Sequence, residues 1–311
     1  MNGTEIIAFL SSNFPAVMTA VGAVTGSLFT AIFLRHKTSV KEFEKIKAGQ
    51  FKEVTDELLA AGKMTYTEYY KANNFLKMAK KADEYYAEMP HKDLLQTYDF
   101  DWFVRFYEAV GNVSDEEMQD IWAKILASEI SESDSFSYRT IDILRNMSRK
   151  DAELFVRICS HSFTDGPERM FLPNDKRYLE KCGIQYIDIM RLNEQGLMFN
   201  DSTISLSIEI NKDQKILLAN NELVLTIAAT DGKEIVANLN QYPFTESGKE
   251  LATLVVEHAS DDDFIEYGRC LAENKRQSVA IYKVIRWNED SVEHERTNLI
   301  TGNNDGESSQ E

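Results

Sequence analysis

The hydropathy pattern begins with an uncharged, largely apolar segment near the N-terminus. No charged residue occurs between Ile6 and Leu34, and the 21 residues from Phe14 to Leu34 are apolar or small. A helix of about 20 residues crosses the roughly 30 Å hydrocarbon core of a bilayer. The pattern therefore predicts a single transmembrane helix in a membrane-anchor segment, residues 1–36, with anchoring side chains Phe14, Pro15, Val21, Leu28, Phe29 and Leu34. The alternatives are a buried hairpin in a soluble protein and a helix in the membrane interface.

Basic residues lie on one side of this segment. No Lys or Arg precedes Arg35, whereas Arg35, Lys37 and Lys41 follow the segment directly. The missing basic n-region argues against a cleaved signal peptide. By the positive-inside rule, the distribution predicts an N-terminus outside the membrane and a cytoplasmic C-terminal region. The lipid bilayer is then the first expected partner.

One face of the predicted transmembrane helix carries small and hydroxyl-bearing residues. They are Ala16, Thr19, Gly22, Ala23, Gly26, Ser27 and Thr30. Small residues, including the G-x-x-x-G spacing of Gly22 and Gly26, let helix backbones approach closely in lipid. We therefore expect self-association into a homo-oligomer; a polar-lined pore and a small-residue face without any such purpose are the alternatives.

Two helical regions follow the anchor. Residues 37–90 are predicted to form a helical hairpin or stalk, with Gly62 ending its first helix and a Thr65/Glu68 capping box opening its second. Residues 91–160 are predicted to form a helical bundle, in which Ser114 with Glu117 and Ser148 with Asp151 mark helix starts. The short turns between amphipathic helices are typical of a compact bundle.

The remaining chain mixes helical and strand patterns. Alternation over Thr203–Ile210, and apolar runs further on, predict strands after a short helix that ends at Gly196. The pattern is similar to winged-helix domains and places a winged-helix-like α+β domain at residues 161–260. A helix plus strand is predicted for residues 261–289 and a disordered tail for residues 290–311. The predicted fold class is mainly α with a smaller α+β part, behind a single N-terminal transmembrane helix and helical arm.

Two runs in the helical bundle carry a family resemblance. Val113–Glu129 and Ser135–Ser148 resemble motifs of uncharacterised bacterial proteins of unknown function, and a looser similarity extends to the abortive-infection protein Abi-alpha. The closer resemblance covers about residues 100–260 and supplies no catalytic residues. It implies a bacterial source, hence the inner membrane as the location, and by analogy a role in anti-phage defence.

Composition and charge restrict the classes of partner. The chain has 34 Lys plus Arg against 51 Asp plus Glu, a net charge of −17. The helix expected to read DNA in a winged-helix domain, Ile184–Asn193, has Arg191 as its single positive charge, whereas phosphate neutralisation needs several. We therefore expect protein contacts there rather than nucleic acid binding. The three cysteines, an odd number at wide spacings, indicate reduced thiols in the cytosol.

Candidate chemistry is sparse in this sequence. Cys159 and His161 are close, but positions i and i+2 of a helix point apart, so a nucleophile–base pair is disfavoured. The Asp261–Asp263 run precedes an apolar helix and is interpreted as helix capping rather than a metal site. Glu129 is expected to pair with Arg139 or Arg145 in a structural role. An aromatic cluster is interpreted as core rather than a ligand box: Trp102, Phe103, Phe106 and Tyr107.

The functional hypotheses follow from these patterns. The first is a non-enzymatic, membrane-anchored, cytosol-facing effector that acts through self-association, in an anti-phage or abortive-infection setting. The second is a passive membrane-tethered adaptor for an unknown cytosolic protein partner. The third is an enzyme with a composite site assembled from distant residues. No catalytic residue, metal ligand or cofactor is assigned from sequence.

Overall fold

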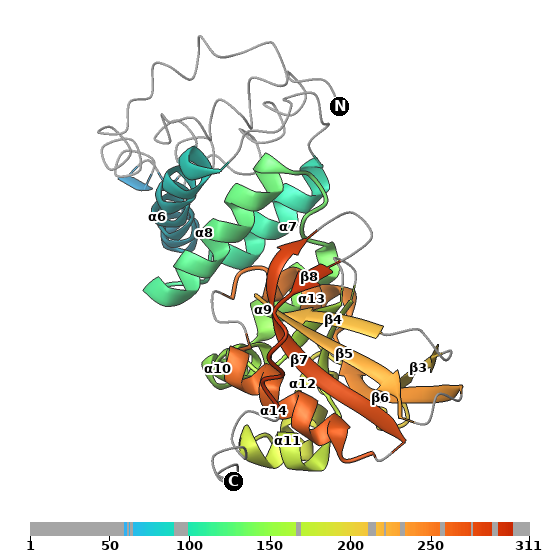
Figure 1. The fold of residues 1–311 in the computed structure, drawn as a ribbon. Helices are drawn as coiled ribbons and strands as arrows, with labels where there is room; N and C mark the ends of the chain where they lie inside the picture. Colours follow the sequence, from blue (N-terminus) through green and yellow to red (C-terminus); the bar gives the residue numbers. More distant parts are fainter. Residues whose placement is uncertain are drawn as a thin grey trace, which may run out of the picture. The chain divides into compact units, whose positions relative to one another are not determined.

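The structure is a computed structural model of the 311-residue chain. It describes residues 59–60, 62, 65–89, 99–165, 169–210, 216–220, 222–230, 234–255, 259–274, 276–287 and 292–300. The chain divides into two compact units, residues 1–146 and 147–311 (Figure 1). The boundary predicted at residue 160 differs from this division by one helix, α10 (Arg149–Cys159), which belongs to the second unit.

The described part of the first unit is helical. Its helices are α6 (Tyr66–Glu88), α7 (Phe100–Val110), α8 (Glu116–Ser131) and α9 (Tyr138–Asn146). Helix α6 packs along α8, and α7 contacts both α6 and α9. The helix predicted to start at the Thr65/Glu68 capping box does so, with both reciprocal hydrogen bonds present. Helix α8 is capped by Asp115 rather than by Ser114, because the Asp115 carboxylate accepts the Met118 N–H.

Aromatic side chains fill the core of this unit. Trp102 stacks on Phe106 with ring centroids 5.0 Å apart, and Phe106 meets Trp122 edge-on at 5.5 Å. The buried Trp102 indole N–H donates to the Phe136 carbonyl at 2.7 Å. The interpretation of the Trp102–Tyr107 cluster as core is therefore confirmed, since all four of its aromatic side chains are buried.

Glu129 is a buried carboxylate with a loop-organising role. Its Oε1 accepts the Asp134 N–H at 2.9 Å and its Oε2 accepts the Phe136 N–H at 3.0 Å. These backbone groups, and not Arg139 or Arg145, are its partners among the described residues, so the predicted ion pair is wrong. Burial raises the pKa of Glu129 to about 7, although the backbone hydrogen bonds oppose the shift.

Glu129 is expected to make the stability of the first unit depend on pH. Because its pKa is raised on folding, its contribution is present below the unfolded value of 4.5 and is lost as pH rises through about 7. The free energy of unfolding should fall by up to about 3 kcal/mol, at 1.4 kcal/mol per pKa unit. Urea titrations followed by tryptophan fluorescence measure the change in this free energy between pH 5 and 8. In a Trp287→Phe background the two remaining tryptophans, Trp102 and Trp122, both lie in the first unit. Glu129→Gln should flatten the dependence; an equal slope in both proteins would contradict the assignment.

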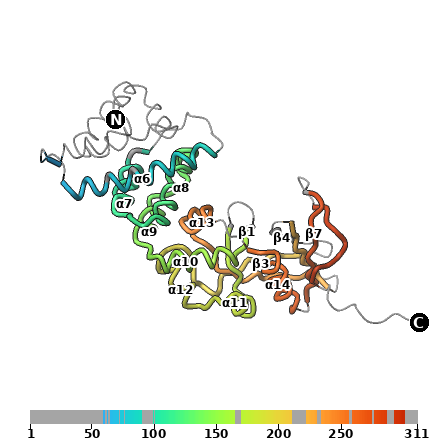
Figure 2. Tube along the Cα trace, turned by 90° about the vertical axis from the view of Figure 1, so that its left-hand side faces the viewer, coloured from blue at the N-terminus to red at the C-terminus, as the bar shows by residue number. Residues whose placement is uncertain are grey.

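The second unit begins with helices that flank a β-hairpin. Helix α10 (Arg149–Cys159) leads to β1 (Phe163–Asp165) and β2 (Arg169–Pro173). Helices α11 (Lys176–Lys181) and α12 (Tyr186–Glu194) follow, and Figure 2 shows α10, α11 and α12 gathered together. The Ser148/Asp151 capping box predicted for α10 is present.

Two four-stranded antiparallel sheets form the rest of this unit. The first has the order β1-β2-β6-β3, with β3 (Ser205–Ile210) and β6 (Ile235–Pro243) paired from Ser205↔Asn240 to Ile210↔Ile235. The second has the order β4-β5-β7-β8. Its strands are β4 (Ile216–Asn220), β5 (Leu223–Ala229), β7 (Gln277–Trp287) and β8 (Val292–His294). Helices α13 (Glu246–Ala252) and α14 (Asp261–Ala272) lie between β6 and β7 in sequence, and α14 packs on β7.

These sheets correct the predicted fold class. The C-terminal half is not a minor α+β part with a separate helix and strand, because β7 pairs with β5 along seven residue pairs and completes a second sheet. Strand β8 also lies in the segment predicted to be disordered. Hydrophobic alternation identified individual strands, but it carries no information about which distant strands pair.

The predicted transmembrane helix and single-pass membrane location are also not supported by the structure. Among the residues that the structure describes, no helix combines the length and apolar character needed to cross a membrane. Helix α6 is 23 residues long, but it carries charged side chains such as Glu68, Lys71 and Lys77 along its length. The residues assigned to the anchor, to helix self-association and to topology (residues 14–41) lie outside the described residues.

Candidate functional site

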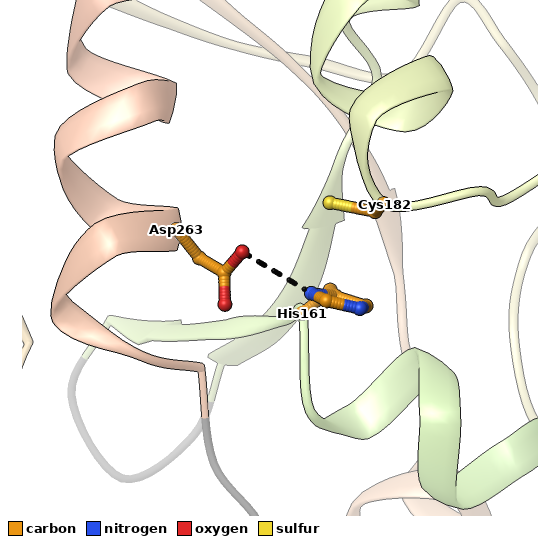
Figure 3. Close-up of side chains that lie close together, drawn as sticks. All are labelled: His161, Cys182 and Asp263. Carbon is orange, nitrogen blue, oxygen red and sulfur yellow. Dashed lines mark ion pairs between the residues drawn. The ribbon is translucent and has the colours of Figure 1, made fainter.

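Three side chains with metal-ligating chemistry meet in the second unit. His161 lies in the turn after α10, Cys182 caps the C-terminus of α11, and Asp263 lies in the first turn of α14. One ligand atom from each residue lies within 4.8 Å of the other two. Figure 3 shows the Asp263 carboxylate directed at the His161 ring, with the Cys182 sulfur beside them. We call these residues the His–Cys–Asp cluster.

His161 is held where helix α10 ends. Its backbone N–H donates to the Ile158 carbonyl at 3.2 Å, and its own carbonyl accepts the Tyr178 hydroxyl at 2.8 Å. The side-chain Nδ1 atom is buried and lies 3.3 Å from Asp263 Oδ1. This contact does not meet hydrogen-bond geometry, so Nδ1 has no hydrogen-bond partner in the described part of the chain. Buried polar atoms without a hydrogen-bond partner are rare in folded proteins, so the environment of this nitrogen calls for an explanation.

Asp263 divides its two oxygens between two roles. Oδ2 accepts the Ser260 hydroxyl at 2.6 Å and the Ser260 N–H at 3.1 Å, which completes the capping box of α14. Oδ1 is left to face His161. The predicted capping role of Asp263 is therefore confirmed, and the same cap fixes the direction in which the second oxygen points.

Cys182 is half-buried and its thiol is not activated. Burial, and next the negative charge of Asp263, raise the pKa of Cys182 to about 11. The thiol is therefore protonated at neutral pH in the metal-free protein. Because the thiolate is the nucleophilic form, this environment is unsuited to a free cysteine nucleophile.

Ion pairs tie together the helices that carry the cluster. Lys181 Nζ lies 3.0 Å from Glu266 Oε2, and Arg269 Nη1 lies 3.2 Å from the same oxygen. Arg177 also contacts Glu273. Hydrogen bonding from Lys181 is the main cause that lowers the pKa of Glu266. The Lys181 and Arg177 pairs join α11, which ends at Cys182, to α14, which carries Asp263, whereas Arg269 and Glu266 both lie in α14.

A packed aromatic layer includes Tyr178, which contacts the cluster. Phe163 stacks on Tyr267 with ring centroids 5.5 Å apart, and it meets Phe264 edge-on at 5.4 Å. Tyr178 lies 6.0 Å from Phe163 and 5.9 Å from Tyr267 between ring centroids. All four side chains are buried. Close packing restricts their movement, so the elements that carry the cluster are well fixed.

The three side chains have the chemistry of ligands for a zinc-type ion. Imidazole nitrogen, thiolate sulfur and carboxylate oxygen bind Zn²⁺ at about 2.0 to 2.3 Å, usually in tetrahedral geometry. Such bond lengths separate neighbouring ligand atoms by about 3.3 to 3.8 Å. His161 Nδ1 and Asp263 Oδ1 are 3.3 Å apart, which is already in this range. All three ligand atoms lie within 4.8 Å of one another, so a small movement of the side chains would bring the whole set into the range.

Sequence patterns pointed to two members of this cluster, His161 and Asp263, but with other neighbours. The candidate neighbour of His161 was Cys159, which is buried, and burial raises the pKa of its thiol far above the neutral range. Asp263 was interpreted as part of an acidic run that caps α14. Cys182 was not considered for chemistry, because nothing in its local sequence marks it.

Helix α12, for which protein contacts were predicted, has exposed apolar side chains. They are Tyr186, Ile187 and Met190. Its Arg191 lies 3.8 Å from Asp151, and its Asp188 lies 3.2 Å from Arg157, so both charges face α10. The contacts of α12 with a protein partner stay a prediction.

Comparison with known proteins gives a family but no activity. Residues 62–268 match the family described as "Protein of unknown function (DUF2806)", a range that includes His161, Cys182 and Asp263. Neither a curated protein nor a solved structure matches the chain. The similarity to Abi-alpha expected from sequence is not confirmed.

Proposed function

The chain belongs to this family of unknown function, and from its geometry we propose that the second unit binds a divalent transition-metal ion of zinc type through His161, Cys182 and Asp263. The observation that carries the proposal is the convergence of three different ligand groups around the buried Nδ1 of His161, which contacts Asp263 but has no hydrogen-bond partner among the described residues. A bound cation would give this nitrogen a coordination partner. It would also balance the negative charge of Asp263 beside the sulfur of Cys182.

The chemistry of the ligands favours zinc over magnesium or calcium. Thiolate and imidazole ligands suit zinc and related transition metals, whereas Mg²⁺ and Ca²⁺ prefer shells made of oxygen. The raised pKa of Cys182 disfavours the competing interpretation, a free cysteine nucleophile paired with His161. A metal ion removes this difficulty, because a coordinating thiol is deprotonated by the ion.

The number of ligands indicates what the ion would do. Within the described residues, the cluster has three ligating side chains. Structural zinc sites are usually closed by four protein ligands, whereas catalytic sites have three and keep one position for water or substrate. The His161 and Asp263 side chains are 24% and 17% exposed, so solvent reaches the edge of the cluster. We therefore propose a metal centre with one exchangeable position, in line with the hypothesis of a composite enzyme site.

Cobalt and zinc titrations of the full purified chain test this function. We expect one Co²⁺ per chain, a sulfur-to-cobalt charge-transfer band, and displacement of the cobalt by Zn²⁺. Cys182→Ser should abolish the charge-transfer band and weaken zinc binding at least about tenfold, because a ligand is lost. Cys159→Ala is the matched control: it removes a buried thiol outside the cluster and should leave both readouts unchanged.

Two results would contradict the proposal. One is a wild-type chain that binds neither metal after treatment with a reductant and a chelator. The other is a charge-transfer band that persists in Cys182→Ser, since the cobalt would then bind a different thiol.

A further inference from the structure

The two oxygens of the Asp263 carboxylate differ in how many hydrogen bonds they accept. Oδ2 accepts the Ser260 hydroxyl at 2.6 Å and the Ser260 backbone N–H at 3.1 Å. Oδ1 lies 3.3 Å from His161 Nδ1 and accepts no hydrogen bond in the part of the chain that the structure describes. A carboxylate oxygen has about two lone pairs. The lone pairs of Oδ2 are therefore both used, whereas those of Oδ1 are available to a cation.

Ser260 holds Asp263 from both the side chain and the backbone. Besides the two bonds to Oδ2, the Ser260 hydroxyl oxygen accepts the Asp263 N–H at 3.1 Å, which completes the reciprocal capping box of α14. Hydrogen bonds to an ionised carboxylate are roughly twice as strong as those between neutral groups. Turning Oδ2 away from Ser260 would break two such bonds, so the capping box opposes rotation of the carboxylate.

The orientation of this carboxylate decides how many positions of a metal ion the protein fills. Asp and Glu bind metal ions through one oxygen or through both. If both Asp263 oxygens bound, they would fill four positions together with His161 and Cys182. If Oδ1 alone binds, three positions are filled, and a tetrahedral ion keeps the fourth for water or another ligand. In the structure Oδ1 faces His161 while Oδ2 is bonded to Ser260, which favours the second arrangement.

Resting on the proposed metal-binding function, we propose that Ser260 is a positioning residue that keeps Asp263 a one-oxygen ligand, so that the metal ion retains an exchangeable position for water or a small anion. Ser260 acts through Asp263 and does not touch the ion. Groups of this kind, which hydrogen-bond to the ligands from outside, strongly affect the properties of metal sites.

Three variants of the full chain separate this role from helix capping. Ser260→Gly removes the hydroxyl, and glycine at an N-cap costs a helix little stability. Ser148→Gly is the matched control, because Ser148 and Asp151 form the same kind of capping box at the start of α10, and Asp151 is not a member of the cluster. Ser260→Thr restores a hydroxyl at the N-cap and should behave like the wild type.

Azide, a small anion that binds metal ions, is the probe of the exchangeable position. The chain is loaded with Co²⁺, and azide is titrated while the visible spectrum of the cobalt is recorded. The wild type, Ser148→Gly and Ser260→Thr should bind azide with equal affinity. In Ser260→Gly the second Asp263 oxygen can turn to the ion and compete with azide, whose affinity should fall at least about tenfold. The sulfur-to-cobalt band should persist in all four proteins, and the Tm of the two metal-free glycine variants should be similar.

The outcomes separate this inference from the proposed function. If the wild type binds no cobalt, the proposed function fails and takes the inference with it. If the wild type binds cobalt but not azide, or if Ser260→Gly binds azide as the wild type does, the inference is overturned while the metal site stands. Equal losses of azide affinity in Ser260→Gly and Ser148→Gly would show a general effect of helix capping, which also overturns it.

A crystal structure of the zinc-loaded wild type gives a second test that needs no substitution. One Asp263 oxygen should lie about 2.0 to 2.2 Å from the zinc ion. The other oxygen should still accept the hydroxyl and the N–H of Ser260. A zinc ion bound by both Asp263 oxygens would overturn the inference and leave the metal site in place.

Discussion

Zinc at about a thousandfold excess over its dissociation constant is expected to raise the free energy of unfolding of the second unit by about 4 kcal/mol. The ligands His161, Cys182 and Asp263 come from three elements that are distant in sequence, so the complete set exists only in the folded state. An ion that binds the folded state alone stabilises it in proportion to the logarithm of its concentration. For a unit of this size, the effect corresponds to a rise in Tm of about 10 °C.

Calorimetry of the full chain with zinc and with a chelator measures this shift. Asp263→Asn is the informative variant, because an asparagine oxygen can still accept the Ser260 hydroxyl and cap α14. The variant loses the charge that faces His161. It should therefore keep most of the stability of the metal-free protein and lose most of the zinc-induced shift. Hydrogen exchange should show slower exchange with zinc at α11 and at the start of α14; equal shifts in Asp263→Asn and wild type would contradict the ligand assignment.

Local signals explain which parts of the fold could be predicted. A capping box involves residues three positions apart, so Thr65/Glu68 and Ser148/Asp151 can be read directly from the sequence. The pairing of β5 with β7 cannot be read in this way, because it joins strands separated by β6, α13 and α14. Each strand shows its own pattern, and the partner is chosen by packing of the whole unit.

The difference between local signals and long-range contacts also explains which residues of the candidate site could be predicted. His161 and Asp263 were candidates because of their neighbours in sequence, namely Cys159 and the acidic run at the start of α14. The rule that positions i and i+2 of a helix point apart disfavoured Cys159 as a partner of His161, but His161 lies in the turn after α10 and not in the helix. The actual neighbour, Cys182, is brought close by the ion pairs and aromatic contacts between α11 and α14. Only the three-dimensional structure contains that information.

Gly248→Ala is expected to destabilise the second unit by about 3 kcal/mol or more, near the upper end of overpacking effects. Gly248 lies in α13, and a Cβ at this position would be 2.1 Å from the Leu197 carbonyl oxygen. That oxygen accepts the Thr245 N–H at 3.0 Å, and the Thr245 hydroxyl donates to the Gly196 carbonyl at 2.6 Å. The segment after α12 is therefore hydrogen-bonded to the start of α13, and the clashing atom cannot move away without breaking this contact.

Gly268→Ala is the matched control for this prediction. Gly268 is also a helical glycine, in α14, and an added Cβ there would lie 2.6 Å from Ile281 Cδ1. Ile281 Cδ1 is the end of a flexible side chain, so a change of rotamer can relieve the contact at a cost of about 1 kcal/mol. Urea unfolding and hydrogen exchange at α12 and α13 measure the difference between the two variants. Equal losses in both would contradict the argument, because a backbone carbonyl held by hydrogen bonds would then yield as readily as a side-chain methyl group.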